Sequence, residues 1–311
     1  MLKRKILALL CVFTSSISAA TPSSHVNELL SQIRPQLMWQ QLSSLTAFPD
    51  RSAASKNGVK AAMWIRQRVN DMIKESKRSD TSLQLIQTRW IDHQGQVTHY
   101  PQPSILLKIG NSTLPGIVIG AHLDTTAGLH RPGADDNGSG AVTLLEMARV
   151  FLNSSTTFKK PIYIVWYGAE EGDLDGSKSV VNYFQQHHMP VAAVMQLDMT
   201  GYALNGDTTL WLSDTGHYRH VNKALTEFTY RVAKRYVRNN IAITHLDDES
   251  DHWSWQEAGY KTVFPMEGNC HGNRRCPYRE HTAKDTMDTL SLSHMTDYLK
   301  LAIAFTAELA M

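Results

Sequence analysis

The amino-acid sequence predicts a single α/β domain in which a mixed, mainly parallel central sheet carries helices on both faces. The chain has 311 residues, of which 42 % are apolar and 19 % are charged. This is ordinary globular composition, with enough length for a large core. Short apolar runs of the kind found in buried strands alternate with longer segments of helical periodicity. No linker rich in Pro, Gly or Ser divides the chain.

The expected elements alternate along the whole chain. Apolar residues at helical spacing predict helices over residues 25–47, 59–73, 141–152, 177–187, 221–237 and 295–309, with a polar break at 50–58 before the second. Short runs rich in β-branched residues predict strands at 83–86, 104–109, 117–119, 162–166, 191–197 and 262–264. Because the later strands are apolar throughout, we expect both faces of the sheet to be covered.

The first twenty residues are predicted to be an export signal rather than part of the fold. Lys3, Arg4 and Lys5 precede a short apolar run, and Ala19-Ala20 provides small residues suited to signal-peptidase cleavage. The alternatives are a cytosolic protein with an apolar N-terminus, or a lipoprotein modified at residue 11. The residue before that cysteine is a bulky leucine, which argues against the lipoprotein. We therefore expect a secreted or periplasmic protein with a mature domain at residues 21–311.

The charge balance excludes one class of partner. The full chain has 31 basic and 29 acidic side chains, and removal of the signal leaves 28 against 29, a formal charge of −1. Such a balance argues against nucleic-acid binding through bulk electrostatics. The apolar run in the signal is too short to span a bilayer, and no other stretch is long enough. No nucleic-acid partner and no membrane span are therefore expected.

The mature chain has two cysteines, Cys270 and Cys276. A disulfide between them is the natural expectation in an exported protein. Closing so small a ring stabilises the fold by about 2 kcal/mol on the chain-entropy model. Two free thiols, or a pair that binds metal, are the alternatives.

Polar clusters follow the predicted buried strands, where the carboxyl ends of parallel strands form ligand sites. They contain His122 with Asp124, Asp136 in a Gly-rich segment, Glu170-Glu171, and Asp198. Acidic and imidazole groups that converge in this way repel one another unless a cation neutralises them. Carboxylates and histidine without thiolates suit zinc or a similar divalent ion at an open catalytic site.

Each cluster alone has a simpler explanation. A lone histidine is more often structural, Asp136 and Ser139 suit a helix cap, and Glu170-Glu171 suits a helix N-terminus. The order of the clusters, each behind a buried strand, favours a common site. The sequence has no dinucleotide fingerprint, phosphate-binding loop, Gly-x-Ser-x-Gly elbow or His-Glu-x-x-His motif. Nucleotide binding and serine hydrolysis therefore lose support.

Together these motifs resemble the secreted bacterial leucyl aminopeptidases of the zinc exopeptidase superfamily. The likeness extends over nearly all of the mature chain. The matching segments are 120–126, 132–140, 169–171, 174–177, 196–200, 250–252 and 281–286, with Ser43–Leu45 and Asp50-Arg51 near the N-terminus. The resemblance implies a zinc exopeptidase fold and two zinc ions per chain.

The resemblance also implies the metal ligands and the catalytic groups. His122 and Asp198 would hold one zinc, Glu171 and His281 the other, and Asp136 would bridge both. A hydroxide between the two ions would be the nucleophile. Glu170 would be its general base.

Neighbouring residues are expected to support these groups. Asp124 would orient His122, and Asp285 is expected to orient His281 in the same way. Ser250 and Asp251 are expected beside the ligands. The family also implies a cis peptide between Asp136 and the following asparagine.

The expected substrates are peptides or proteins with a free N-terminus. Met199, Phe264 and Met266 are expected to form the apolar wall of a pocket for the first residue, with Glu280 beside it. A Leu-like side chain is therefore favoured, unless a carboxylate lies inside the pocket and selects Lys or Arg. Two other functions remain open, a glutaminyl cyclase with one zinc and a non-catalytic binding module of the same fold. A monomer is expected.

Overall fold

The computed structural model describes the chain except for residues 1–22, 92–93, 204–205, 214–217, 245–248 and 268–278. The predicted export signal and the cysteines Cys270 and Cys276 lie outside the described residues. Within the described part, no helix combines the length and apolar character that crossing a bilayer requires.

An eight-stranded mixed sheet forms the centre of the domain, in the order β1-β4-β6-β5-β7-β10-β8-β9. The four neighbouring strands β6, β5, β7 and β10 run parallel, and the strands next to them on either side run antiparallel. The strands are β1 (Thr81–Ile86), β4 (Ser104–Ile109), β5 (Gly116–His122), β6 (Ile162–Tyr167), β7 (Val191–Gln196), β8 (Leu210–Ser213), β9 (Ile241–Thr244) and β10 (Thr262–Glu267). A separate hairpin pairs β2 (Arg89–Ile91) with β3 (Val97–His99).

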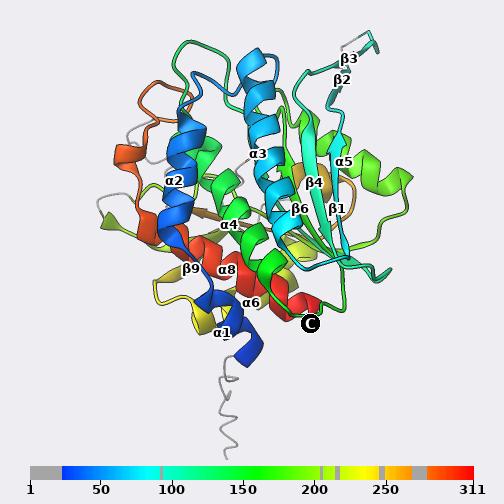
Figure 1. Cartoon of the computed structure of the whole chain (residues 1–311), viewed down its shortest axis with the longest axis vertical. Coiled ribbons are helices and arrows are strands. Elements are labelled where there is room, and N and C mark those ends of the chain that lie inside the picture. The colour runs from blue at the N-terminus through cyan, green and yellow to red at the C-terminus, as the bar shows by residue number, and fades with distance from the viewer. Residues whose placement is uncertain (1–22, 92–93, 204–205, 214–217, 245–248, 268–278) are drawn as a thin grey trace, which may run out of the picture.

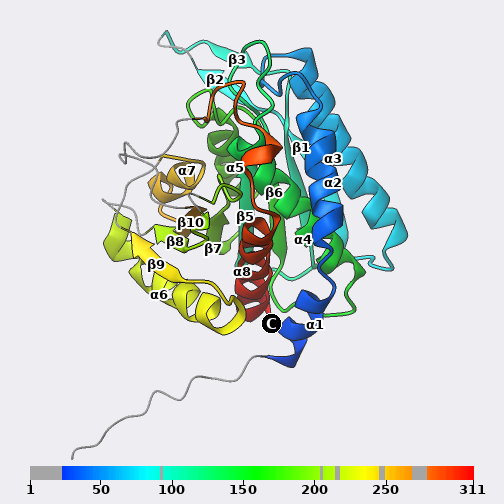
Figure 2. The same ribbon diagram turned by 90° about the vertical axis from the view of Figure 1, so that its left-hand side faces the viewer.

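Helices cover both faces of the sheet. Figure 1 looks onto the side that carries α2, α3 and α4, and Figure 2 shows α5 and α7 on the opposite side. The first side holds α1 (Ser24–Ser31), α2 (Pro35–Thr46), α3 (Lys56–Glu75), α4 (Gly140–Asn153), α6 (Arg219–Tyr236) and α8 (Leu292–Ala310). The second holds α5 (Asp175–Gln186) and α7 (His252–Glu257). The predicted fold class is confirmed.

Strand β6 shows why a central strand can be apolar along its whole length. Ile164 and Trp166 point into the core beneath α4, whereas Tyr163 and Val165 point into the core beneath α5. Because side chains alternate between the faces of a strand, a sheet covered on both sides needs apolar residues at every position. The Trp166 indole N–H donates to the Ala141 carbonyl at 2.9 Å, which ties β6 to α4.

Several elements differ from the predicted pattern. The helix predicted over residues 25–47 is two helices, because α1 ends at Ser31 and α2 begins at Pro35, whose missing N–H suits a first helical position. The sequence did not predict β2, β3, β8, β9 or α7. Each of these has three to six residues, which is too short for a clear periodicity.

Candidate metal centre

The parallel strands bring the predicted ligands to one edge of the sheet. His122 is the last residue of β5, Glu170 and Glu171 lie in the loop after β6, and Asp198 lies two residues after β7. Asp136 comes from the irregular turn at Ala134–Ser139, before α4. The Asp136–Asn137 peptide is cis, as the resemblance implied.

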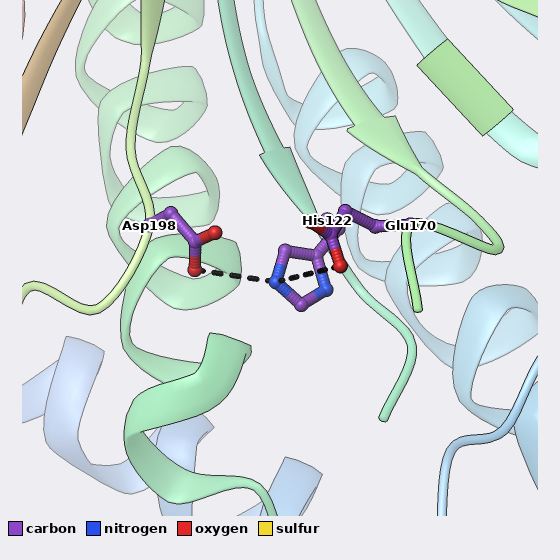
Figure 3. Close-up of side chains that lie close together, drawn as sticks. All are labelled: His122, Glu170 and Asp198. Atoms are coloured by element: carbon purple, nitrogen blue, oxygen red, sulfur yellow. Dashed lines mark hydrogen bonds and ion pairs between the residues drawn. The ribbon is translucent and has the colours of Figure 1, made fainter. Parts of the chain in front are cut away.

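The first group of donors consists of His122, Glu170 and Asp198. The His122 ring lies between the two carboxylates, with its Nε2 atom 3.2 Å from Asp198 Oδ1 and 4.0 Å from Glu170 Oε2 (Figure 3). One donor atom from each residue lies within 4.8 Å of the others. This spacing leaves room for one metal ion.

The second group consists of Asp136, Glu171 and His281. The His281 Nε2 atom lies 3.0 Å from Asp136 Oδ2 and 3.0 Å from Glu171 Oε2. The other oxygen of the same aspartate, Asp136 Oδ1, lies 3.2 Å from His122 Nε2 in the first group. Asp136 therefore presents one oxygen to each group, as a bridging ligand would.

The electrostatics of the site fit a cation. Burial raises the pKa of Glu170 well above its usual range, and the charges of Asp198 and Asp251 add to this. Burial and the charge of Asp136 raise the pKa of Glu171 to about 7. A divalent ion would stabilise these carboxylates in their charged form, which is the form that binds metal.

The histidines and the bridging aspartate show the complementary effect. Hydrogen bonds to Asp136 and Glu171 raise the pKa of His281 to about 11. Although burial opposes it, contact with His122 and His281 lowers the pKa of Asp136 below its usual range. Both shifts show that the acidic side chains favour positive charge at the two groups of donors. A metal ion would supply that charge. The donor set and its charge therefore fit zinc at both groups.

Asp124 supports both glutamates as well as His122. Its carboxylate accepts hydrogen bonds from the backbone N–H of Glu170 at 3.0 Å and of Glu171 at 3.3 Å. Its Oδ1 atom also lies 3.5 Å from His122 Nδ1. The predicted contact with His122 is thus present, and the sequence did not predict that Asp124 also fixes the Glu170-Glu171 loop.

Asp285 does not support His281 as expected. Its two carboxylate oxygens accept hydrogen bonds from the backbone N–H of Asp135 at 2.8 Å and of Asp136 at 3.0 Å. Asp285 therefore positions the turn that carries the bridging ligand. The sequence could not predict this role of Asp285, because the donors are backbone N–H groups and the Asp135 donor lies 150 residues away in the chain.

We expect Asp285→Asn to weaken zinc binding about 10- to 100-fold, the range typical of residues that position metal ligands. In the wild type, each Asp285 oxygen accepts one backbone N–H group. Asparagine replaces one of these oxygens with an amide N–H₂, so one of the two hydrogen bonds is lost. Competition with a zinc chelator measures the affinity. Asp288→Asn, three residues later and on the surface, is the matched control. Equal affinity in the two variants would show that Asp285 has no such role.

Ser250 and Asp251 belong to a chain of hydrogen bonds that ends on a predicted ligand. The Ser250 hydroxyl donates to Asp198 Oδ2 at 2.7 Å. Gln196 donates from Nε2 to the Ser250 hydroxyl at 3.2 Å and to Asp251 Oδ2 at 2.9 Å. These side chains are buried, so the chain fixes the direction in which Asp198 presents its other oxygen to His122.

Arg51 has a structural role that the resemblance alone did not indicate. Its fully buried guanidinium donates to the carbonyls of Leu123 at 2.9 Å and Gly133 at 2.8 Å, and also to that of Pro132. It thus ties the segment after His122 to the turn that carries Asp136. A buried cation at this position also offsets the surrounding negative charge.

A cavity of about 390 Å³ opens beside the two groups of donors. Met199, Phe264, Met266 and Glu280, the residues predicted for the substrate pocket, all line it. Glu249 also lines it, and the sequence did not predict the remaining lining residues outside the donor groups, which are Asp173, Leu174 and Glu267. The predicted pocket and the predicted metal site are therefore continuous.

Comparison with known families decides the assignment. Residues 105–306, which include both groups of donors, match the model of peptidase family M28. The chain belongs to peptidase family M28. A leucine aminopeptidase 1 from Coccidioides posadasii is 33 % identical over 293 residues, which is 91 % of this chain and 73 % of that protein.

Solved structures of M28-like fold agree with this assignment. The LapA aminopeptidase of Legionella pneumophila is 39 % identical, covers 92 % of this chain and 74 % of its own, and superposes with a TM-score of 0.84. LapB from the same organism is 39 % identical, with coverage of 95 % and 78 % and a TM-score of 0.85. The prediction of an enzyme, a zinc-dependent aminopeptidase, is confirmed by the family and these relatives.

Proposed function

We propose that this M28 enzyme is an exported, monomeric aminopeptidase that uses two zinc ions to remove a bulky first residue, apolar or basic, from peptides and proteins. The observation that carries the proposal is the Asp136 carboxylate, which presents one oxygen to each of two groups of donors. Secretion is supported by the sequence of the first twenty residues, and the periplasm is the alternative destination.

The metal ligands and Glu170 have separate roles in hydrolysis. Zinc bound at the two groups would polarise the scissile carbonyl and acidify the attacking water. Glu170 accepts the proton from that water and returns it to the leaving amine. Its carboxyl group lies 4.0 Å from His122 Nε2 at the edge of the first group of donors, and Asp124 fixes the backbone beside it through the Glu170 N–H.

The lining of the cavity supports a requirement for a free N-terminus. Several carboxylates line it, so a substrate amine has acidic partners there. An acylated terminus has no amine to offer and carries a carbonyl oxygen into the same acidic surroundings. The enzyme is therefore expected to act only on the ends of peptides.

Cleavage of Leu-anilide and acetyl-Leu-anilide tests the proposal. We expect hydrolysis of the first, none of the second, loss of activity with a chelator, and recovery with added zinc. Metal analysis should find two zinc ions per chain. Hydrolysis of the acetylated substrate at a similar rate would contradict the exopeptidase assignment.

The two alternatives predict different results. A glutaminyl cyclase would hold one zinc and release no free amino acid, whereas the Asp136–Glu171–His281 group supports a second ion. A non-catalytic binding module would not need Glu170, and this chain has it beside the first group of donors. Metal count and anilide hydrolysis together separate the three functions.

A further inference from the structure

The loop between β6 and α5 carries Glu170 and Glu171, and its backbone takes an unusual path. Ala169, Asp173 and Leu174 in this loop have positive φ angles of 55°, 75° and 59°. Residues other than glycine adopt this left-handed conformation only where surrounding contacts hold them in it. The position of the two carboxylates at the metal centre therefore depends on contacts that fix the loop from outside.

Asp124 provides the first of these contacts, through the backbone N–H groups of Glu170 and Glu171. Tyr100, the residue after β3, provides a second one at Gly172. A Cβ atom at Gly172 would lie 2.5 Å from the Tyr100 hydroxyl oxygen and 3.2 Å from its ring Cζ. The hydroxyl end of the tyrosine therefore rests on the backbone of the loop, at a position where only glycine leaves room for it.

The same hydroxyl also reaches the start of the next helix. It donates a hydrogen bond to the carboxyl of Asp175, the first residue of α5. Burial and this acidic neighbour raise the pKa of Tyr100 to about 12, so the hydroxyl keeps the proton that it donates at neutral pH. Tyr100 thus contacts the chain at Gly172 and at Asp175, on either side of the two left-handed residues Asp173 and Leu174.

The hairpin of β2 and β3 fixes the position of Tyr100 itself. The Tyr100 N–H donates to the Thr88 carbonyl at 3.1 Å, and the Tyr100 carbonyl accepts Gln87 Nε2 at 2.9 Å. The hairpin is in turn fastened to α5, because the Arg89 N–H donates to the Ser179 hydroxyl at 3.0 Å. Figures 1 and 2 show this hairpin near α5 and apart from the main sheet. Tyr100 is therefore held relative to the helix that begins where the loop ends.

We infer that Tyr100 is a positioning residue that holds the Glu170-Glu171 loop in place for catalysis, an inference that rests on the proposed aminopeptidase function. Tyr100 is not among the described residues that line the cavity, so it acts through Gly172 and Asp175. Without it, Glu170 would move relative to the attacking water, and Glu171 relative to the second group of donors. A displacement of about 1 Å can lower a rate about 10²-fold, so the effect should appear mainly in kcat.

Substitutions at residues 100 and 172 test the inference with zinc-loaded enzyme and Leu-anilide. Gly172→Ala should lower kcat about 10- to 100-fold and change KM less than about threefold, because the new Cβ displaces the loop. Tyr100→Phe should lower kcat about three- to tenfold, through loss of the hydrogen bond to Asp175. The variant with both substitutions should recover to the level of Tyr100→Phe, since only the 3.2 Å contact with ring Cζ then remains.

This recovery separates positioning from general destabilisation. Removal of a hydroxyl would not rescue an alanine that merely weakens the fold, whereas it relieves a specific clash. Tyr183→Phe is the matched control, because Tyr183 is also half-buried, lies on α5 and donates its hydroxyl to Gln84. This control should leave kcat unchanged.

Zinc affinity gives a measurement that does not depend on turnover. Because Glu171 belongs to the second group of donors, Gly172→Ala should weaken zinc binding about tenfold or more in competition with a chelator. The double variant should restore this affinity. If Gly172→Ala does not fold, Tyr100→Ala replaces it, and should lower kcat about tenfold or more while Tyr183→Ala does not.

Wild-type kcat and zinc affinity in both single variants would overturn the inference. A loss in Gly172→Ala that the double variant retains, or normal kcat in Tyr100→Ala, would also overturn it. Failure of the wild-type enzyme with two zinc ions to cleave Leu-anilide would instead overturn the proposed function. The zinc affinities of the same variants would then decide by themselves whether Tyr100 positions the loop.

Discussion

Glu170→Gln is expected to lower turnover about 10²- to 10⁴-fold, the usual cost of removing a general base, while zinc content stays at two per chain. The Glu170 carboxyl lies 4.0 Å from His122 Nε2, whereas Asp136 and Asp198 lie 3.2 Å from the same atom. Asp136 and Asp198 are thus better placed as ligands, and Glu170 is left for proton transfer. Glutamine keeps the shape of the side chain and removes its basicity.

Steady-state kinetics and metal analysis on the same preparation test this assignment. Glu257→Gln, on the surface of α7, controls for general effects of replacing a glutamate. A variant that loses one zinc would show that Glu170 is a ligand, since it also belongs to the first group of donors. A variant with normal turnover would remove Glu170 from the mechanism.

The sequence indicated which side chains meet at the candidate metal centre, because these residues follow the central strands. His122 and Asp198 follow mainly apolar runs, and such runs locate buried strands without knowledge of the tertiary structure. The order of strands in the sheet was not needed, because all parallel strands end at the same edge. The family resemblance then supplied the roles of individual residues.

Supporting residues were harder to predict because they act on backbone atoms. Asp285 accepts two backbone N–H groups of a distant turn, and Arg51 donates to backbone carbonyls of two segments. Backbone groups are the same at every position, so no residue pattern identifies the partner.

The negative charge at the centre explains why the fold supplies so many fixed hydrogen bonds there. Asp124 and Asp285 each accept two backbone N–H groups, and Asp198 accepts the Ser250 hydroxyl. Hydrogen bonds to a charged carboxylate stabilise that charge and restrict the side chain to one orientation. The same bonds hold the ligand positions close to the geometry that metal binding needs, which lowers the cost of assembling the site.

Asp136→Ala is expected to remove more zinc than any other single ligand substitution, with affinity falling well over about 100-fold at both groups. This exceeds the 10- to 100-fold typical of residues that only position a ligand. The reason is that one Asp136 oxygen lies 3.2 Å from His122 Nε2 and the other lies 3.0 Å from His281 Nε2. Loss of this carboxylate also removes the negative charge that contacts both His122 and His281.

Asp198→Ala provides the comparison that isolates bridging from ordinary ligation. Asp198 contacts His122 and no member of the second group among the described ion pairs, so its loss should deplete mainly one zinc. Metal analysis after dialysis at fixed free zinc, with circular dichroism to confirm folding, measures both variants. The bridging assignment fails if the Asp136 variant retains one zinc at full occupancy and remains active, while the Asp198 variant loses as much metal or more. Asp136 would then bind a single ion.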